Sequence, residues 1–356
     1  MGLSELFSAG RVPKALIGRT LVLGEAADLM QAGGLLAALE SRFGPIALGI
    51  VGEAAYGGPH AHVELPATHG ADRKRIKRLR PERLIVIGRA GDRAALVRDV
   101  EAPKCWLNAL SPQAAQAGCE RITVAGARQQ ALIPDSILTG DPLLELDAMP
   151  ALDSDPTICE RFAPYRERGH SVVCAAGTGE HEEPIAYAML FELLRDRTTI
   201  LILAPRDPQR YEPVYRDAIK YNLPTIRHSR LMTSYVPHKN RVYFVEAEHA
   251  ATPLLACADV VVAGGSLHAR AGVEPDLLTA LRLGRPVIVG PVRPDRLTRS
   301  AVESGVVRDC PDAESLAGAA RELLDDPEGT QTLTAEASSW LQLQSGARQR
   351  VLDLLG

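Results

Sequence analysis

The stretch Ala258-Asp259-Val260-Val261-Val262-Ala263-Gly264-Gly265-Ser266 decides the fold. An apolar, β-branched run of this length predicts a strand that is buried on both faces, as in a parallel sheet covered by helices. The strand runs directly into two glycines and a serine. Glycine lets backbone approach a ligand closely, and consecutive N–H groups with a hydroxyl can hold phosphate oxygens. A plain strand-to-helix turn explains the same spacing equally well, so both interpretations stay open.

Similar apolar runs recur before and after this stretch and alternate with longer helical patterns. Strands are predicted at residues 20–24, 46–51, 84–88, 104–108, 121–124, 171–176, 199–204, 241–245, 260–263 and 286–290. Helices are predicted over 26–42, 92–100, 182–195, 212–222, 313–324 and 334–355. This alternation is typical of doubly wound α/β domains.

The length of the chain predicts two such domains. A chain of 356 residues is too long for one ordinary core, and a stretch around residues 147–155 has several breakers and no periodicity. We expect an N-terminal Rossmann-like domain over 1–150, a linker over 151–168, and a C-terminal Rossmann-like domain with a terminal helix over 169–356. Ligands of open α/β sheets bind beside the carboxyl ends of strands, so the site is expected in the cleft between the domains.

Charge and hydropathy exclude two classes of protein. A net charge of −4 argues against a general nucleic-acid binder. The longest apolar runs have the length of strands, so no membrane-spanning segment or signal peptide is expected.

Cysteine and histidine positions predict neither disulfides nor a metal. The six cysteines form no Cys-x-x-Cys pair, which predicts reduced, mostly buried thiols in a soluble cytoplasmic protein. Three histidines cluster in a loop, but no acidic partner has metal-ligand spacing, so no metal site is expected at His60, His62 and His69.

Two charged residues near strand ends in the second half are candidate ligand contacts. Arg206 follows the strand at 199–204, where a guanidinium can bind a phosphate in two bonds or pair with Asp207 or Glu212. Glu274 precedes a proline shortly after Gly272, where a carboxylate can accept bonds from a ribose diol or cap a helix.

In the first half, Glu25 directly follows the strand at 20–24. A carboxylate at this strand end can act as a general base facing the cleft. The alternative is an acid at the first turn of the next helix, favoured by the helix dipole.

The strongest charge feature is the basic run from Arg73 to Arg83. Ile76 and Leu79 interrupt it three positions apart, the spacing of a narrow buried stripe on a helix. One interpretation is a solvated helix face. The other is contact with acidic head groups at a membrane surface, with nucleic acid the lesser option.

With these features in hand, the chain resembles the 3-deoxy-D-manno-octulosonic acid (Kdo) transferases of lipopolysaccharide assembly. The run from Ala258 to Pro291 is similar to their Ala-Asp-Val strand, Gly-Gly-Ser-Leu, Glu-Pro helix and Gly-x-Pro-Val strand. The run from Leu201 to Tyr211 is similar to their Leu-Ile-Leu-Val-Pro-Arg-His-Pro-Glu-Arg-Phe. Matches in the same order include Thr139-Gly140-Asp141, Leu79-Arg80-Pro81 and Leu23-Gly24-Glu25, and together they span residues 20–325.

The resemblance implies a GT-B glycosyltransferase fold, in which the N-terminal domain over 1–150 lies on the acceptor side and the C-terminal domain over 169–356 binds the nucleotide sugar, with the two Rossmann-like lobes facing a cleft. It implies CMP-Kdo as donor, a lipid A precursor or another acidic glycolipid as acceptor, and inversion without a metal or cofactor. Glu25 would be the base, Arg206 would bind the CMP phosphate, and Gly264, Gly265 and Ser266 would approach the nucleotide or the sugar carboxylate. The protein would work at the inner face of the plasma membrane, held there by the basic run.

Several motif positions differ from that family. Glu274 stands where the family has asparagine, Leu277 where it has a donor-contacting glutamate, and Asp207 where it has histidine. Gly88-Arg89 replaces an acidic pair. Two alternatives therefore stay open: an inactive relative that binds a nucleotide sugar or a partner transferase, and a GT-B enzyme that uses another nucleotide sugar.

Overall fold

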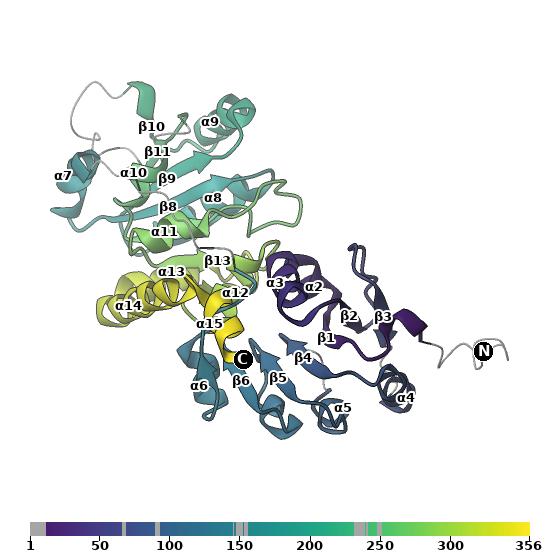
Figure 1. The fold of residues 1–356 in the computed structure, drawn as a ribbon. Coiled ribbons are helices and arrows are strands. Elements are labelled where there is room, and N and C mark those ends of the chain that lie inside the picture. Colours follow the sequence, from purple (N-terminus) through teal and green to yellow (C-terminus); the bar gives the residue numbers. More distant parts are fainter. Residues whose placement is uncertain are drawn as a thin grey trace. The chain divides into compact units, whose positions relative to one another are not determined.

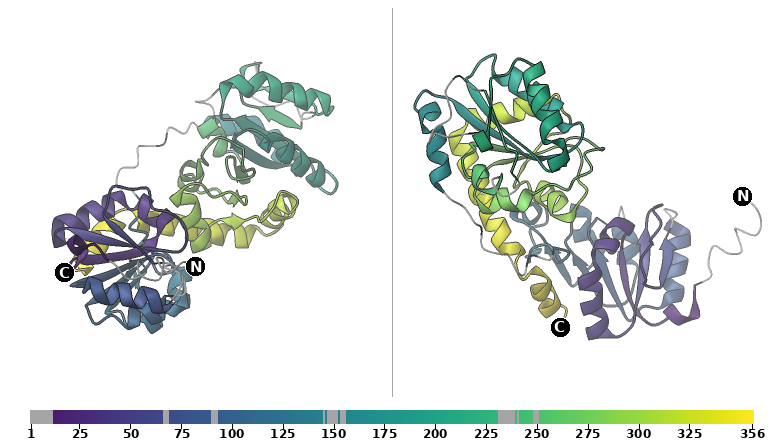
Figure 2. Two further views of the ribbon diagram at one scale, coloured as in Figure 1. Left: turned by 90° about the vertical axis from the view of Figure 1, so that its right-hand side faces the viewer. Right: turned by 90° about the horizontal axis from the view of Figure 1, so that it is seen from above.

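The computed structural model describes residues 12–65, 69–89, 93–144, 146, 152, 156–230, 239, 241–247 and 251–356. The chain divides into two compact units (Figures 1 and 2). The first unit contains Met1–Ala148 and Gln342–Gly356, and the second contains Met149–Leu341. Each unit is a parallel β-sheet with helices on both faces, so the predicted class of two doubly wound α/β domains, the components of a GT-B fold, is confirmed.

In the first unit, the described residues form one sheet in the strand order β3-β2-β1-β4-β5-β6-β7. Its strands are all parallel to their neighbours: β1 (Thr20–Glu25), β2 (Ile46–Val51), β3 (His62–Leu65), β4 (Arg83–Ile87), β5 (Lys104–Leu107), β6 (Arg121–Val124) and β7 (Ile137–Leu138). The chain adds strands outward from β1 on one side and then returns to place β4 on the other. The topological switch point, where ligands of such sheets bind, therefore lies between β1 and β4.

Two cores cover the faces of this sheet because side chains of β1 alternate between them. Leu21 and Leu23 pack with helices α4 (His69–Leu79) and α5 (Ala94–Arg98) and the 3₁₀ helix η2 (Pro112–Ala117). Val22 packs with α2 (Ala26–Gln31), α3 (Gly33–Phe43) and α15 (Ala347–Leu354). The shorter η1 (Lys14–Leu16) and α6 (Ala127–Leu132) complete the unit.

In the second unit, the described strands follow the order β10-β11-β9-β8-β12-β13-β14, again all parallel. They are β8 (Ser171–Thr178), β9 (Thr199–Pro205), β10 (Thr225–Arg227), β11 (Val242–Phe244), β12 (Val260–Ala263), β13 (Val287–Val289) and β14 (Arg308–Asp309). The switch point of this sheet lies between β8 and β12.

Helices of the second unit enclose its sheet. One core joins the sheet to α8 (Glu182–Leu193), α9 (Tyr211–Lys220) and α13 (Leu316–Asp325). The other helices are η3 (Pro156–Phe162), α7 (Ala163–Arg166), η4 (Pro208–Arg210), η5 (His228–Arg230), α10 (Ala251–Leu255), α11 (Leu277–Arg282), α12 (Arg296–Ser304) and α14 (Pro327–Gln344).

The C-terminal segment packs with the first unit, although the sequence placed it in the second domain. Gln344 is buried, and its side chain accepts a bond from the Asp141 N–H at 2.7 Å and donates to the Ala125 carbonyl at 3.2 Å. Gly140 leaves no room for a Cβ, which would lie 2.6 Å from the Leu343 carbonyl oxygen. The Thr139-Gly140-Asp141 motif therefore packs against the end of α14 and the start of α15.

Other boundaries also differ from the sequence prediction. The helix predicted over 26–42 breaks at Ala32, before two glycines, into α2 and α3. Residue 92, the predicted start of another helix, and positions 151 and 153–155 of the predicted linker lie outside the described residues. From residue 156 the linker range forms η3 and α7.

The prediction of six reduced thiols is wrong for one pair, because Cys159 and Cys257 form a disulfide across 98 residues of sequence. Pairing at such a distance depends on the tertiary fold and cannot be read from spacing. The other four cysteines are free. Among the described residues, each helix is too short or too polar to traverse a bilayer.

Candidate functional site

The carboxyl edge of the second sheet carries most of the predicted ligand contacts. A cavity of about 220 Å³ opens there, between the ends of β8, β9 and β11 and the first turns of α10. Gly177 and Arg206 line one side, Thr252 lines another, and Asp276 adds a carboxylate. Backbone, a guanidinium and an acid therefore meet at the position where open α/β sheets bind ligands.

The two glycines of the predicted loop are required by packing of the protein on itself. A Cβ on Gly264 would lie 2.4 Å from the carbonyl oxygen of Gly177. Gly265 has a φ of +79°, and its Cβ would lie 2.7 Å from the Val273 carbonyl oxygen. These glycines bring three backbone segments of the strand edge into direct contact.

The N–H groups of this loop are bonded to a buried carboxylate that the sequence analysis did not single out. Glu182, at the start of α8, is closed to solvent. Its Oε2 accepts from the N–H groups of Gly179 at 2.8 Å and Gly265 at 2.7 Å. Its Oε1 accepts from Leu267 at 2.7 Å and His268 at 3.3 Å. The only sequence signal was an acid at a helix start, which is common.

Ser266 is also engaged within the protein. Its hydroxyl donates to the Ala263 carbonyl and accepts from the Gly290 N–H at 2.9 Å, and the residue is fully buried. The serine thus ties the end of β12 to the end of β13. These two bonds give the hydroxyl a structural role.

Arg206 does not form the ion pair that was its alternative interpretation. Its Nη2 donates to the Glu274 carbonyl oxygen at 3.1 Å, and the exposed guanidinium lies over Gly177. Asp207 instead accepts from the Gln209 N–H at 2.9 Å, and Glu212 pairs with Arg216 and Arg227. Within the described part of the chain, most donors of Arg206 therefore remain available to an anion.

Glu274 and Gly272 lie on an exposed segment before α11. The helix cap is Asp276, which accepts from the Thr279 N–H and hydroxyl, so Glu274 is not the cap. Gly272 has a φ of +68° and open space around its α-carbon. The Glu274 carboxylate has no bonded partner within the described part of the chain and is accessible to a ligand.

In the first unit, Glu25 lies at the switch point between β1 and β4. It occupies the N-cap position of α2 without a side-chain capping bond, and it is partly exposed. The buried acid of that first turn is Asp28. A carboxylate oxygen of Asp28 lies 2.4 Å from where a Cβ on Gly88 would be, so Asp28 fills the space beside the end of β4.

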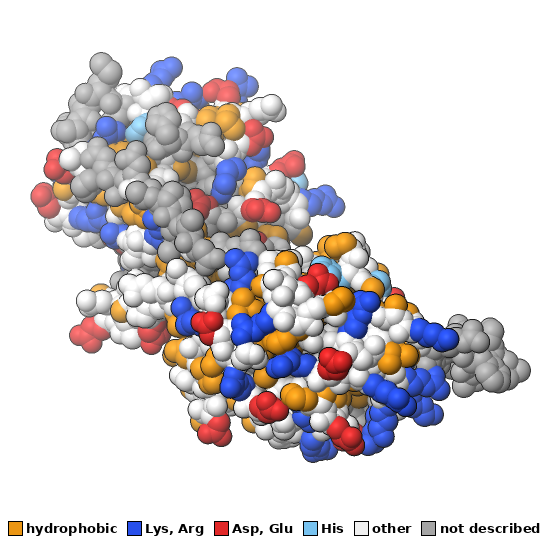
Figure 3. Space-filling model, in the orientation of Figure 1, with side chains coloured by type: hydrophobic (Ala, Val, Ile, Leu, Met, Phe, Trp, Pro, Cys, Tyr) orange, Lys and Arg blue, Asp and Glu red, His pale blue; other side chains and the backbone are white. Residues whose placement is uncertain are grey.

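The basic run forms α4 and the turn that follows it. Ile76 and Leu79 are buried as the predicted stripe, and Lys and Arg side chains gather over this helix (Figure 3). Arg83 differs, since it packs over Phe43 and donates to the Leu355 carbonyl at 3.3 Å. The exposed basic surface therefore ends at Arg80.

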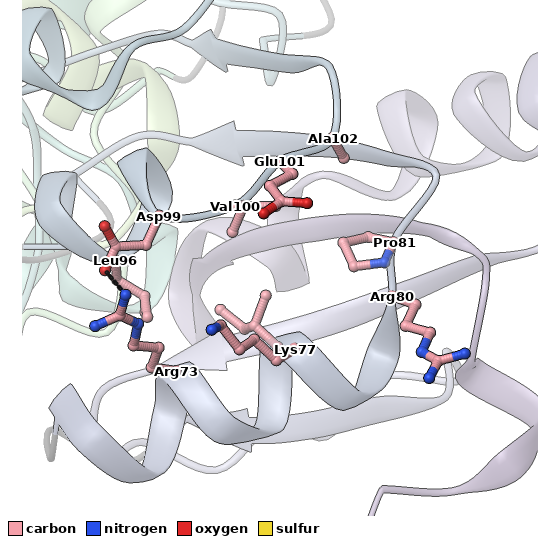
Figure 4. Close-up of a pocket in the computed structure, with 10 residues that line it drawn as sticks. Arg73, Lys77, Arg80, Pro81, Leu96, Asp99, Val100, Glu101 and Ala102 are labelled. Carbon is pink, nitrogen blue, oxygen red and sulfur yellow. Dashed lines mark ion pairs between the residues drawn. The ribbon is translucent and has the colours of Figure 1, made fainter.

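A cavity of about 460 Å³ adjoins this helix (Figure 4). Arg73 pairs with Asp99 at 3.2 Å on its wall, with Lys77 and Glu101 nearby, whereas the Arg80 side chain extends away. The lining residues directly precede β4 and β5. The cavity thus lies at the amino edge of the sheet, opposite the edge that carries Glu25.

The histidine cluster provides no metal site in the described residues. His60 contacts Tyr56 and Glu40, at 3.2 and 3.7 Å, and His62 stacks edge-on against Tyr56.

Comparisons with known proteins support the resemblance over half the chain. No family model matches. The chain is 30% identical over 193 residues to the 3-deoxy-D-manno-octulosonic acid transferase of Bordetella pertussis. This match covers 52% of this chain and 44% of the relative, so the chain matches less than half the length of that protein.

Solved structures give weaker likenesses. The C-terminal CMP-Kdo binding domain of WaaA from Acinetobacter baumannii matches at 26% identity, over 52% of this chain and 96% of that domain, with a TM-score of 0.47. MurG of the same organism matches at 11% identity over 95% of this chain and 99% of its own, with a TM-score of 0.45.

Proposed function

We propose that this protein is a glycosyltransferase of the Kdo transferase type, transferring Kdo from CMP-Kdo to a lipid A precursor or another acidic glycolipid. The similarity to the Bordetella transferase over half the chain supports the class. The observation that carries the proposal is the available guanidinium of Arg206 beside a cavity at a carboxyl strand edge. A guanidinium there can hold the single phosphate of a CMP-sugar in two bonds.

In the proposed reaction, Glu25 removes the proton from the acceptor hydroxyl. The hydroxyl oxygen attacks the anomeric carbon of Kdo, and the bond from that carbon to the CMP phosphate oxygen breaks with inversion. Arg206 stabilises the charge that develops on the departing phosphate. Glu25 fits the role of base because it lies at a switch point, is partly exposed and makes no side-chain capping bond at the start of α2.

For the acceptor, we propose that the exposed cations of α4 contact an anionic membrane surface at the inner face of the plasma membrane. Lys74, Lys77 and Arg78 are exposed on this helix, and Arg80 follows it. Each cation near such a surface contributes about 1 kcal/mol of attraction.

One observation favours a second candidate, an inactive relative that binds nucleotide sugar without transfer. In the loop predicted to approach the donor, the Gly265 N–H is already bonded to Glu182.

Isothermal titration with CMP and UDP tests the proposal first. We expect CMP to bind more tightly than UDP. If neither nucleotide binds, both the transferase and the inactive relative that binds a nucleotide sugar are ruled out.

A Kdo transfer assay then compares Glu25→Ala with Glu53→Ala, in which the replaced residue is an exposed acid just after β2. Loss of a general base lowers the rate by about 10²–10⁴-fold, and only the Glu25 variant should show it. Equal rates in both variants would refute the assignment of the base, and no transfer by the wild type would favour the inactive relative.

A further inference from the structure

The Gly264–His268 loop has the glycines of a phosphate-binding loop, but four of its N–H groups already donate within the protein. Three of its N–H groups, those of Gly265, Leu267 and His268, point at the Glu182 carboxylate. A phosphate in a glycine loop normally occupies the position that this carboxylate holds.

The helix that follows β8 is occupied in the same way. The positive end of the α8 dipole carries Glu182 and Glu183 in its first turn, both buried. Arg210 neutralises Glu183 through two bonds of 2.7 and 2.8 Å. Glu182 has no cation partner in the part of the chain that the structure describes, and its charge is met by backbone dipoles. A second anionic group near this loop would therefore meet a buried like charge.

The remaining attraction for an anion comes from a side chain on another strand. Arg206, directly after β9, uses one donor on the Glu274 carbonyl, and its other donors have no acceptor among the described residues. A planar guanidinium binds one phosphate group through two hydrogen bonds. A diphosphate is usually bound by a row of backbone N–H groups, which the guanidinium does not replace.

Building on the proposed function, we infer that Glu182 is a specificity-determining residue that restricts the donor site to nucleoside monophosphate sugars and rejects nucleoside diphosphates. It occupies the loop donors that a second phosphate would need and places a negative charge behind them.

CMP and CDP are the sharpest probes, because they share base and sugar and differ by one phosphate. Titration calorimetry on the full chain compares wild type, Glu182→Gln and Glu183→Gln. An amide nitrogen in place of one carboxylate oxygen cannot accept a bond, so Glu182→Gln removes the charge and leaves two of the four N–H groups that donate to Glu182 without their acceptor. We expect the wild type to bind CDP no more tightly than CMP, and Glu182→Gln to shift the CDP-to-CMP affinity ratio toward CDP by about tenfold.

Glu183→Gln is the matched control, since it changes the neighbouring buried acid and leaves the loop contacts in place. Its ratio should equal that of the wild type. A purely structural role for Glu182 would weaken both nucleotides together, and an unchanged ratio in Glu182→Gln would overturn the inference.

A wild-type measurement tests the inference even where Glu182→Gln fails to fold. Inorganic pyrophosphate should compete with CMP no better than inorganic phosphate, and a preference for pyrophosphate of about tenfold would contradict the inference while leaving nucleotide binding intact. A wild type that binds neither CMP nor CDP would overturn the proposed function, and the inference with it.

Discussion

At the scale of single residues, Gly264 and Gly272 are glycines for different reasons: Gly264 has no space for a side chain, and Gly272 has a backbone conformation that side chains disfavour. A Cβ at Gly264 would collide with the Gly177 backbone at 2.4 Å, whereas Gly272 has open space and only its φ of +68° disfavours a side chain. Backbone cannot move aside as a flexible side chain can. We expect Gly264→Ala to lower the free energy of unfolding by about 3 kcal/mol or more and Gly272→Ala by about 1 kcal/mol. Urea unfolding of both variants measures the difference, and equal losses would contradict it.

Whether a site residue could be predicted from the sequence depends on whether its signal is local. Gly264, Gly265 and Arg206 could be chosen because they directly follow predicted strands, and parallel strand ends meet at one edge. The role of Glu182 could not be predicted, because its partners include backbone groups 83 to 86 positions away. Backbone N–H groups carry no residue identity, so no pattern marks them as partners.

At the scale of elements, α15 depends on the junction formed by Gln344. Replacement by leucine would leave the Asp141 N–H and the Ala125 carbonyl unpaired in a buried position. Each unpaired group costs about 1–3 kcal/mol, so we expect Gln344→Leu to destabilise the first unit by about 3 kcal/mol. Hydrogen exchange should show lost protection along α15.

Gln349→Leu is the matched control, since Gln349 is exposed and, among the described residues, its side chain bonds the Asp353 side chain alone. Protection of α15 in that variant should match the wild type. Equal loss in both variants would show that the helix does not depend on the junction.

Most elements could be predicted because their signals are local. Apolar runs such as residues 20–24 and 260–263 became strands with nearly the predicted bounds. The short strands β3, β7, β10 and β14 were missed, since they have two to four residues and all but β7 contain polar residues. The packing of α15 on the first unit was missed because its apolar stripe does not say which sheet it covers.

At the scale of the whole molecule, the thiol count tests the disulfide. In guanidinium without reductant we expect four reactive thiols per chain, rising to six after reduction. In native protein, burial raises the pKa of Cys174 to about 12 and that of Cys119 to about 11, so both should react slowly at mildly alkaline pH. A Cys159→Ser variant should show five thiols without reductant. Six in the unreduced wild type would contradict the bond.

Each unit has a hydrophobic core of its own, so the two units can lose structure separately. We expect two calorimetric transitions, with Gln344→Leu lowering the one that belongs to the first unit. If CMP binds at the carboxyl edge of the second sheet, a concentration of about 100 times its Kd adds about 2.7 kcal/mol to that unit. CMP should therefore raise only the transition that Gln344→Leu leaves unchanged. A CMP shift of the same transition that the variant lowers would place the nucleotide in the first unit and refute the donor-site assignment.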